Sequence, residues 1–215
     1  MKEDIIMAFS GFTDSDFDVF YIPGLEPRME ALIERVRPKL HELGDRLSPA
    51  LSALCGEEMF PHVAKHARRT INPPNDTWVA WANNKKGYKA HPHFQVGLWP
   101  THLFVQFALI YESPNKAAFG RQLERHWNDI QPLIPAHYVW SLDHMQPEAT
   151  PHAEMKGDTL DQLIHKLQHV KKSEALCGLH IDRRDPLAAD GERLIAEIEH
   201  VFETVMPLYR LAYQI

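Results

Sequence analysis

The hydrophobic pattern changes its period in the middle of this 215-residue chain, and no other feature of the sequence constrains the fold as strongly. Towards both ends, apolar residues recur every three to four positions, as they do on amphipathic helices. Between residues 59 and 111 they alternate with polar or small residues, as they do in half-buried strands. Strands grouped in the centre of a chain, with helices before and after them, indicate an α+β fold and not alternating βαβ units.

We therefore expect one compact α+β domain over residues 1–215, with a central, mainly antiparallel sheet packed against helices from the N- and C-terminal parts. With 44% apolar residues, the chain can form one sizeable core. Expected strands span residues 59–68, 77–83, 92–99, 102–111, 137–143 and 175–181. Expected helices begin near residues 27, 45, 113, 158 and 190, and Pro38 should kink or break the first of them.

One hairpin can be placed in register from its sequence. A turn at Pro100 and Thr101 lets the flanking strands pair so that the numbers of opposite residues sum to 201. This register gives one face three apolar pairs, which are Leu98 with Leu103, Val96 with Val105, and Phe94 with Phe107. The other face then places Gln95 opposite Gln106, and His93 opposite Ala108. We expect helices to cover the apolar face of this hairpin.

Positive charge is concentrated in one segment of an acidic protein. The chain has a net charge of -6, which disfavours nonspecific binding of DNA, RNA or anionic lipid. Residues 59–93 contain six basic side chains and one acid, a local charge of +5, whereas the remaining 17 basic and 28 acidic residues give -11. Such a segment is either a small-anion site or a solvated turn whose lysines protect a sheet edge. The solvated turn is favoured for Lys85 and Lys86, and both alternatives stay open for Arg68 and Arg69.

The leading hypothesis is a domain that binds a small anion, such as a phosphorylated metabolite or a nucleotide, on the polar face of the sheet. Arginine and lysine form charge-assisted hydrogen bonds with phosphate or carboxylate oxygens. The candidate ligand-binding residues are Arg68, Arg69, Lys89, His91, His93, Gln95 and Gln106. The two glutamines either donate hydrogen bonds to the ligand or bond each other.

The main alternative is a metal-assisted hydrolase, because the chain contains 14 histidines. Helical spacing places His165, His169 and His200 on solvated faces, and His126 on the core-facing side of its helix. The remaining candidates are His62, His66, His91 and His93, together with Asp143 or His144. Adjacent strand residues point to opposite faces, so only one of the last two can serve. The spacing matches no zinc motif, and the sequence therefore assigns no metal and no cofactor.

A third hypothesis is a protein-interaction module, in which Trp99 and Tyr88 help the polar face to dock a partner. Trp78 and Trp81 are three positions apart in an expected strand, so their indoles should point to opposite faces. Burial of both in the core is the favoured interpretation. The alternative is that one of them forms a wall on which a ligand stacks.

Motifs for phosphate-binding loops, dinucleotide binding, serine hydrolases and calcium loops are all absent from the sequence. Cys55 and Cys177 are far apart and form no CxxC pair, so we expect free thiols in a reducing compartment. The apolar run Ile5–Phe9 is too short for the core of a signal peptide, and no window is long and apolar enough to span a membrane. These observations predict a cytoplasmic protein.

Three segments carry a family resemblance: GEEMFPHVAKHARRTINPPNDTWVAWANNKKGYKAHPHFQVGLWPTH, the upstream RMEALIERVRPKLHELG and the downstream SLDHMQPE. In these segments the chain resembles the YktB-like proteins of Bacillus and related Firmicutes, and the likeness covers nearly its whole length. The resemblance implies a compact α+β domain of the bacterial cytoplasm. That family has no established activity, so the resemblance transfers no catalytic residue, substrate or cofactor.

Overall fold

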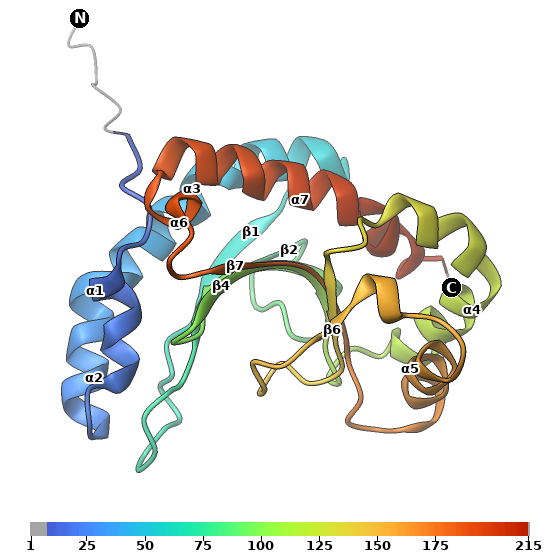
Figure 1. Ribbon diagram of the computed structural model, residues 1–215, viewed down its shortest axis with the longest axis horizontal. Coiled ribbons are helices and arrows are strands. Elements are labelled where there is room, and N and C mark those ends of the chain that lie inside the picture. The colour runs from blue at the N-terminus through green and yellow to red at the C-terminus, as the bar shows by residue number, and fades with distance from the viewer. Residues whose placement is uncertain (1–7, 215) are drawn as a thin grey trace, which may run out of the picture.

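The computed structural model describes residues 8–214, and a seven-stranded sheet runs through their centre (Figure 1). The strands are β1 (Phe60–Val63), β2 (Thr77–Ala82), β3 (His93–Leu98), β4 (His102–Leu109), β5 (Val139–Ser141), β6 (Thr150–Pro151) and β7 (Ala175–Asp182). Their order is β1-β2-β3-β4-β7-β5-β6, and all neighbours are antiparallel. The α+β class expected from the sequence is confirmed. Residues 5–7 of the apolar run considered above lie outside the described part.

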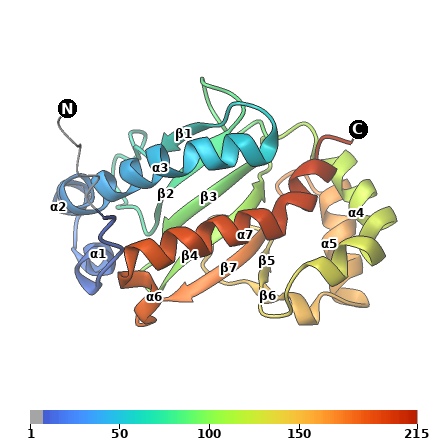
Figure 2. The ribbon, with the colours of Figure 1, turned by 90° about the horizontal axis from the view of Figure 1, so that it is seen from above.

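The α-helices of the described residues lie around this sheet (Figure 1). They are α1 (Asp14–Phe17), α2 (Leu25–Ala31), α3 (Arg37–Cys55), α4 (Lys116–Ile130), α5 (Asp158–His169), α6 (Pro186–Ala189) and α7 (Gly191–Leu211). Figure 2 shows α3 and α7 lying side by side across one face of the sheet, where α3 contacts β1 and β2 and α7 contacts β4. None of the described helices has both the length and the apolar character needed to span a membrane.

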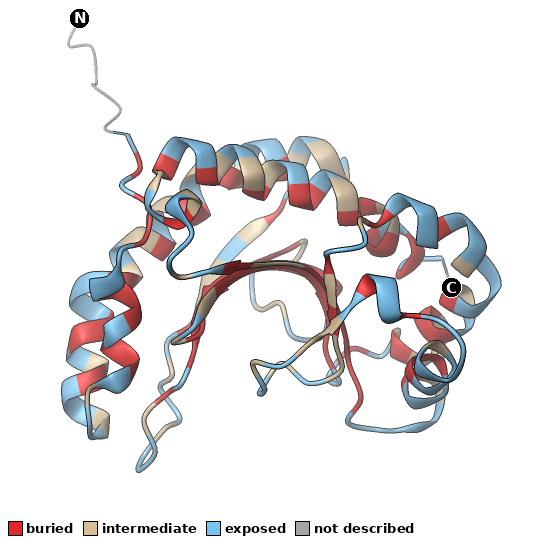
Figure 3. Cartoon of the chain, viewed as in Figure 1, coloured by how far each residue is buried: buried red, intermediate tan, exposed pale blue. Residues whose placement is uncertain are grey.

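The central hairpin has the register that its alternation predicts. Phe94 lies opposite Phe107, and Gln95 lies opposite Gln106. Phe94 and Phe107 are fully buried on the face that α3 and α7 cover, together with Val96 and Val105 from the same two strands. Figure 3 shows that the buried sides of α3 and α7 are those turned towards the sheet. One continuous hydrophobic core therefore fills the space between the two helices and this face, which we call the covered face.

The N-terminal helical segment is interrupted next to Pro38, where the sequence predicted a kink or break. A π-helical turn over Leu32–Val36 separates α2 from α3, and Pro38 lies in the first turn of α3. The missing N–H of proline is tolerated in a first turn, and a π-helical turn supplies the local change in helix geometry. The expectation that Asp45 begins a second helix is wrong, since Asp45 lies inside α3, which ends only at Cys55.

The strand expected over residues 59–68 is shorter than predicted. β1 ends at Val63, and His66 has a φ of 51°, in the left-handed region that breaks an extended strand. His62 and His66 therefore do not share one face of a strand. The chain leaves the sheet here and forms a long loop that returns to β2, and this loop carries Arg68 and Arg69.

The second face of the sheet is concave, and loops border it in place of the helices that lie on the covered face (Figure 1). We call it the polar face. Residues from three loops, over 64–76, 83–92 and 142–149, line hollows on it. The candidate residues predicted from the sequence lie on or beside this face.

Candidate functional site

One row of side chains crosses the polar face at Gly97. The strand register places Trp78 and Phe104 on either side of Gly97, and His180 beyond Phe104. A Cβ atom at Gly97 would lie 2.4 Å from Phe104 and 2.6 Å from Trp78. The two aromatic side chains can approach each other over the strand only because this position has no side chain.

The neighbouring row contains a chain of hydrogen bonds. Gln106 Nε2 donates to Gln95 Oε1 at 3.0 Å, and Gln95 Nε2 donates to His93 Nε2 at 2.9 Å. His93 Nδ1 lies 2.7 Å from the carbonyl oxygen of His91. A carbonyl can only accept, so this contact assigns the proton of the His93 ring to Nδ1. This series of hydrogen bonds fixes the direction of both glutamine amides. Of the two alternatives left by the sequence, the one in which the glutamines bond each other is therefore present.

His93 lies under this network as a neutral group. It is completely buried, and burial lowers the pKa of its ring to about 3. The ring of Tyr88 packs edge-on against it, with the two centroids 4.9 Å apart. His93 therefore supports the glutamines from below and has no open nitrogen to offer to a ligand.

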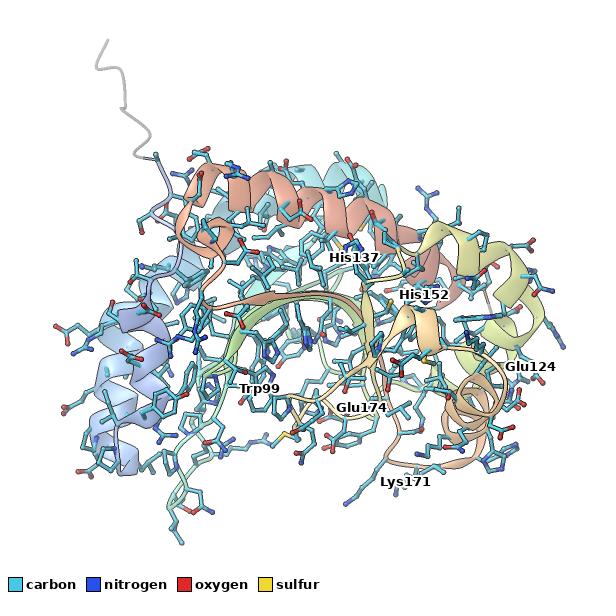
Figure 4. All side chains as sticks on the ribbon, viewed as in Figure 1. Trp99, Glu124, His137, His152, Lys171 and Glu174 are labelled. Carbon is cyan, nitrogen blue, oxygen red and sulfur yellow. The ribbon has the colours of Figure 1, made fainter. Side chains whose placement is uncertain are left out.

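A small pocket of about 20 Å³, room for about one water-sized group, lies above the two glutamines, and we call it the amide pocket. Gln95, Gln106 and Leu176 form its floor, and Trp78, Trp99 and Phe104 supply aromatic walls. Asp76, Asp143, His144 and Glu148 contribute ionisable groups to its lining. Figure 4 shows Trp99 and Glu174 on the concave side of the sheet, away from α7. The pocket thus combines fixed amides, indole surfaces and ionisable side chains.

A second hollow of about 670 Å³ lies beside the first, and we call it the basic groove. Its lining includes Lys65, His66, Arg68, Arg69, Lys86 and Lys89, with Glu112 as an acidic member. Trp78 lines both the basic groove and the amide pocket. Its indole Nε1 donates a hydrogen bond of 3.0 Å to the hydroxyl of Tyr88, which holds the shared wall in place.

The predicted ligand-binding residues divide between these two hollows. Arg68, Arg69 and Lys89 line the basic groove, whereas Gln95 and Gln106 line the amide pocket. His93 lies below the surface, and the half-buried His91 contributes its carbonyl to the hydrogen-bond chain. The predicted residues therefore lie on or beside one face, but the sequence did not separate the cationic part from the amide part.

The structure shows the surroundings of the two tryptophans and the two cysteines for which the sequence made predictions. Trp81 is buried in the core and donates to the carbonyl oxygen of Gly44 at 3.1 Å. Trp78 lies half-buried on the opposite face, so the interpretation that buries both indoles in the core is wrong. Cys55 and Cys177 are free thiols, as expected.

The amide pocket contains a carboxyl group with a raised pKa. Asp76 is only 5% exposed, and burial raises the pKa of its carboxyl to about 6, although the positive charges of His144 and Arg69 act in the opposite direction. A carboxyl with this pKa exchanges its proton close to neutral pH. From the sequence, Asp76 stands out only as the single acid of the basic segment over residues 59–93.

His144 is the second ionisable group of the pocket. Burial alone would lower the pKa of its ring, but the hydrogen bond and the negative charge of Glu174 raise it above the usual value. Glu174 is 1% exposed and its two oxygens lie 2.8 Å from His144 Nδ1. Glu174 is not among the residues predicted from the sequence, and its one signal there is an isolated acid directly before the apolar strand β7.

The histidines predicted as metal ligands are engaged elsewhere. His62 Nε2 lies 2.9 Å from the carbonyl oxygen of Asn84, and His66 Nε2 lies 3.3 Å from Thr77 Oγ1. Within residues 8–214, the one group with metal-like spacing is Asp143, His144 and Glu174, whose ligand-type atoms lie within 4.8 Å of one another. The hydrogen bonds from His144 to Glu174 explain this spacing, so it gives no separate support for a metal.

The expectation that Asp143 and His144 point to opposite faces is wrong. It assumed a strand over residues 137–143, whereas β5 ends at Ser141 and both residues lie in the turn that follows. In a turn, adjacent side chains are not forced apart by the pleat of a strand. Both residues therefore line the amide pocket.

Several other histidines are now placed. His165, His169 and His200 are exposed on their helices, as expected. His126 is exposed as well, so its expected position on the core-facing side of α4 is wrong, because the buried stripe of that helix runs through Phe119, Leu123 and Ile130.

Comparisons with known proteins identify relatives along almost the entire chain. Residues 12–209 match the family model described as "Domain of unknown function (DUF1054)". The chain is 52% identical to a UPF0637 protein of Bacillus licheniformis, over 97% of this chain and 99% of that protein. It is 52% identical to one of Bacillus velezensis, over 95% and 97%, and 46% identical to one of Bacillus cytotoxicus, over 95% and 99% of the two chains.

Proposed function

The chain belongs to the DUF1054 family, and we propose that it binds a nucleotide, or a closely similar phosphorylated molecule, on the polar face of its sheet. The resemblance to a family of Bacillus proteins is thereby confirmed, and the function has to be inferred from the site. One observation carries the proposal: Trp78 forms a wall of the amide pocket and of the basic groove at once. A ligand with a planar polar end and an anionic end would contact both hollows at this shared wall.

The amide pocket suits one polar group on the edge of the planar end, because its free volume of about 20 Å³ has no room for a whole base. Gln95 and Gln106 are held by hydrogen bonds, so their remaining amide positions are oriented before a ligand arrives. A nucleobase presents both donors and acceptors at its edge and can satisfy an amide in either direction. The indole of Trp78, which also lines the larger basic groove, offers a stacking surface for the base, and stacking on an aromatic side chain is worth about 1–3 kcal/mol per base.

The basic groove suits the anionic end. Arg68, Arg69 and Lys89 carry the positive charge expected from the sequence, and Lys89 lies only 3.5 Å from its acidic neighbour Glu112. Exposed ion pairs of that kind are weak, so a phosphate can compete with Glu112 for the lysine. Each charge-assisted hydrogen bond to a phosphate contributes about 1.5–3 kcal/mol before the cost of binding is subtracted.

The proposed compartment is the cytoplasm. The free thiols of Cys55 and Cys177 suit the reducing conditions found there, and nucleotides are abundant in the same compartment. The other two hypotheses drawn from the sequence, a metal-assisted hydrolase and a protein-docking surface, gain no observation of their own from the geometry.

The test is a titration followed by tryptophan fluorescence and by calorimetry, with ADP, adenosine and inorganic phosphate as ligands. We expect ADP to bind more tightly than adenosine or phosphate alone. The double variant Arg68→Gln, Arg69→Gln should weaken ADP binding at least tenfold and leave adenosine binding unchanged. The matched control is Arg121→Gln, Arg125→Gln, which removes the same charge from the exposed side of α4. Absence of ADP binding, or equal effects of both double variants, would refute the proposal.

A further inference from the structure

The amide pocket contains an imidazole whose orientation is fixed by a buried carboxylate. The oxygens of Glu174 accept hydrogen bonds from the backbone N–H of His144 at 2.7 Å and of Tyr111 at 3.3 Å, and both lie 2.8 Å from His144 Nδ1. Nδ1 must donate in this contact, because an ionised carboxylate can only accept. His144 Nε2 is therefore the nitrogen left with a free lone pair. A carboxylate that orients an imidazole in this way is the usual support of a general base.

A second group of the same pocket can supply a proton. Asp76 lines the pocket together with His144, and each of the two groups influences the titration of the other. A carboxyl kept partly protonated near neutral pH is suited to general acid catalysis. The charges that face this pair are Arg69 on the side of Asp76, and Glu174 and Asp143 on the side of His144.

The pair formed by Asp76 and His144 lies next to the basic groove, which is proposed to hold the anionic end of the ligand. Arg69 lines the basic groove and also lowers the pKa of Asp76, so its charge acts on both hollows. A phosphoryl group held by Arg69 would lie at the boundary between the groove and the pocket. The same boundary is formed by Trp78.

We propose that His144 and Asp76 are the catalytic base and acid that hydrolyse the phosphodiester bond of a bound nucleotide diester, with Glu174 as the positioning residue. This inference rests on the proposed function, since it assigns a reaction to the same site. It requires water as the second reactant and no other group.

The reaction balances as follows. His144 Nε2 removes a proton from a water molecule while the water oxygen forms a bond to phosphorus. The bond between phosphorus and the leaving oxygen breaks, its electron pair stays on that oxygen, and the protonated carboxyl of Asp76 supplies the proton. His144 then releases its proton to solvent and Asp76 takes one up, so that one water is consumed and a phosphomonoester and an alcohol are formed.

Two phosphodiesters with different leaving groups separate the role of the base from that of the acid. Bis(p-nitrophenyl) phosphate has a leaving group that departs without protonation, whereas the phenol of diphenyl phosphate is a poorer leaving group. His144→Gln should lower turnover of both substrates by about 100-fold or more, in line with the usual contribution of a general base. Asp76→Asn should lower turnover of diphenyl phosphate at least tenfold more than that of bis(p-nitrophenyl) phosphate. A loss of equal size on both substrates would contradict the role of Asp76.

Glu174→Gln tests the positioning role through the pH profile of kcat/KM. Loss of the carboxylate charge should move the limb that reports the base to lower pH by about one unit. A purely structural role would lower the rate by the same factor at every pH and would overturn this assignment. The matched control is Glu154→Gln, an exposed acid outside the pocket lining, which should leave the profile unchanged.

The proposed function and this inference can fail separately. If the wild-type protein does not bind ADP, the proposed function fails. If it binds ADP but turns over neither phosphodiester, only the catalytic inference fails. Turnover that a chelator abolishes would overturn the acid–base assignment in favour of a metal-assisted reaction, whereas turnover that persists in the chelator and is inhibited by ADP supports both proposals.

Discussion

The two faces of the sheet use the same strands for opposite purposes. On the covered face, Phe94 packs against the rings of Phe202 and Tyr209 from α7, with both centroids 5.0 Å away. On the polar face, the next residue, Gln95, is also buried, but it is held by hydrogen bonds to His93 and Gln106. Burial alone therefore does not distinguish the two faces. The difference is that one face gains its stability from apolar contact, while the other keeps polar groups in fixed directions beside two hollows.

The largest expected effect comes from removing an anchor of the covered face. Phe94→Ala should destabilise the protein by about 3–5 kcal/mol, because it leaves a cavity between β3 and α7. Urea unfolding measures the change, and the surface variant Tyr21→Ala is the control because Tyr21 is 63% exposed. A loss below about 1 kcal/mol, no larger than a typical surface substitution, would mean that this face does not carry the fold.

The next effect has the opposite sign and lies on the polar face. In the folded protein the pKa of Asp76 is about 6, above the usual 3.8, so folding favours its protonated form. Its contribution to stability is present below pH 3.8 and is lost as the pH rises through 6. Asp76→Asn should therefore stabilise the protein at pH 8 by up to about 3 kcal/mol, and by little at pH 3.

Thermal and urea unfolding at both pH values test this prediction. Asp129→Asn is a suitable control because Asp129 is exposed on α4. If Asp76→Asn destabilises the protein at pH 8 as much as at pH 3, then Asp76 is a structural residue. Burial of its carboxyl would then not lower the stability of the protein in favour of a reaction.

A smaller loss is expected when the hydrogen-bond chain is cut. Gln95→Met preserves the shape of the side chain, but it leaves His93 Nε2 and the amide of Gln106 without their partner. Unpaired buried polar groups of this kind cost about 1–3 kcal/mol. Gln162→Met, on the exposed side of α5, is the control, and an equal response of the two variants in urea unfolding would contradict the account of the network.

The smallest effect on stability is expected in the basic groove. Arg68 is exposed, and the hydrogen bonds of Arg69 to the carbonyls of Asn72 and Pro73 are long, at 3.4 Å each. Arg68→Gln, Arg69→Gln should change the free energy of unfolding by less than about 0.5 kcal/mol. A loss above about 2 kcal/mol in urea unfolding would mean that these arginines hold the loop together and are not kept for a ligand.

The strands of the hairpin could be predicted because each position alternates between two environments that differ in polarity. A shift of one residue would have placed Gln95 in the core, so the sequence specifies the register strongly. The π-helical turn before Pro38 could not be predicted, since it has no simple hydrophobic period by which it could be recognised. Similarly, the loop from Ala64 to Asp76 has no periodic pattern that fixes the positions of Arg68 and Arg69.

The candidate site could be predicted only in part for a related reason. Gln95 and Gln106 were found because strand pairing relates them directly. His144 and Glu174 are 30 positions apart and meet through a turn, so no local pattern connects them. The raised pKa of Asp76 depends on burial by the folded chain, which a sequence motif does not report.

The most direct test of the proposed difference between the two faces is an NMR titration of the protein with ADP, observed at the indole Nε1–H signals. Trp78 and Trp99 line the amide pocket, whereas Trp81 is buried under the covered face and bonded to Gly44. We predict that the signals of Trp78 and Trp99 shift in a saturable way and that the signal of Trp81 stays in place. A titration in which Trp81 shifts alone, or in which no indole responds, would contradict the assignment of the polar face as the binding site.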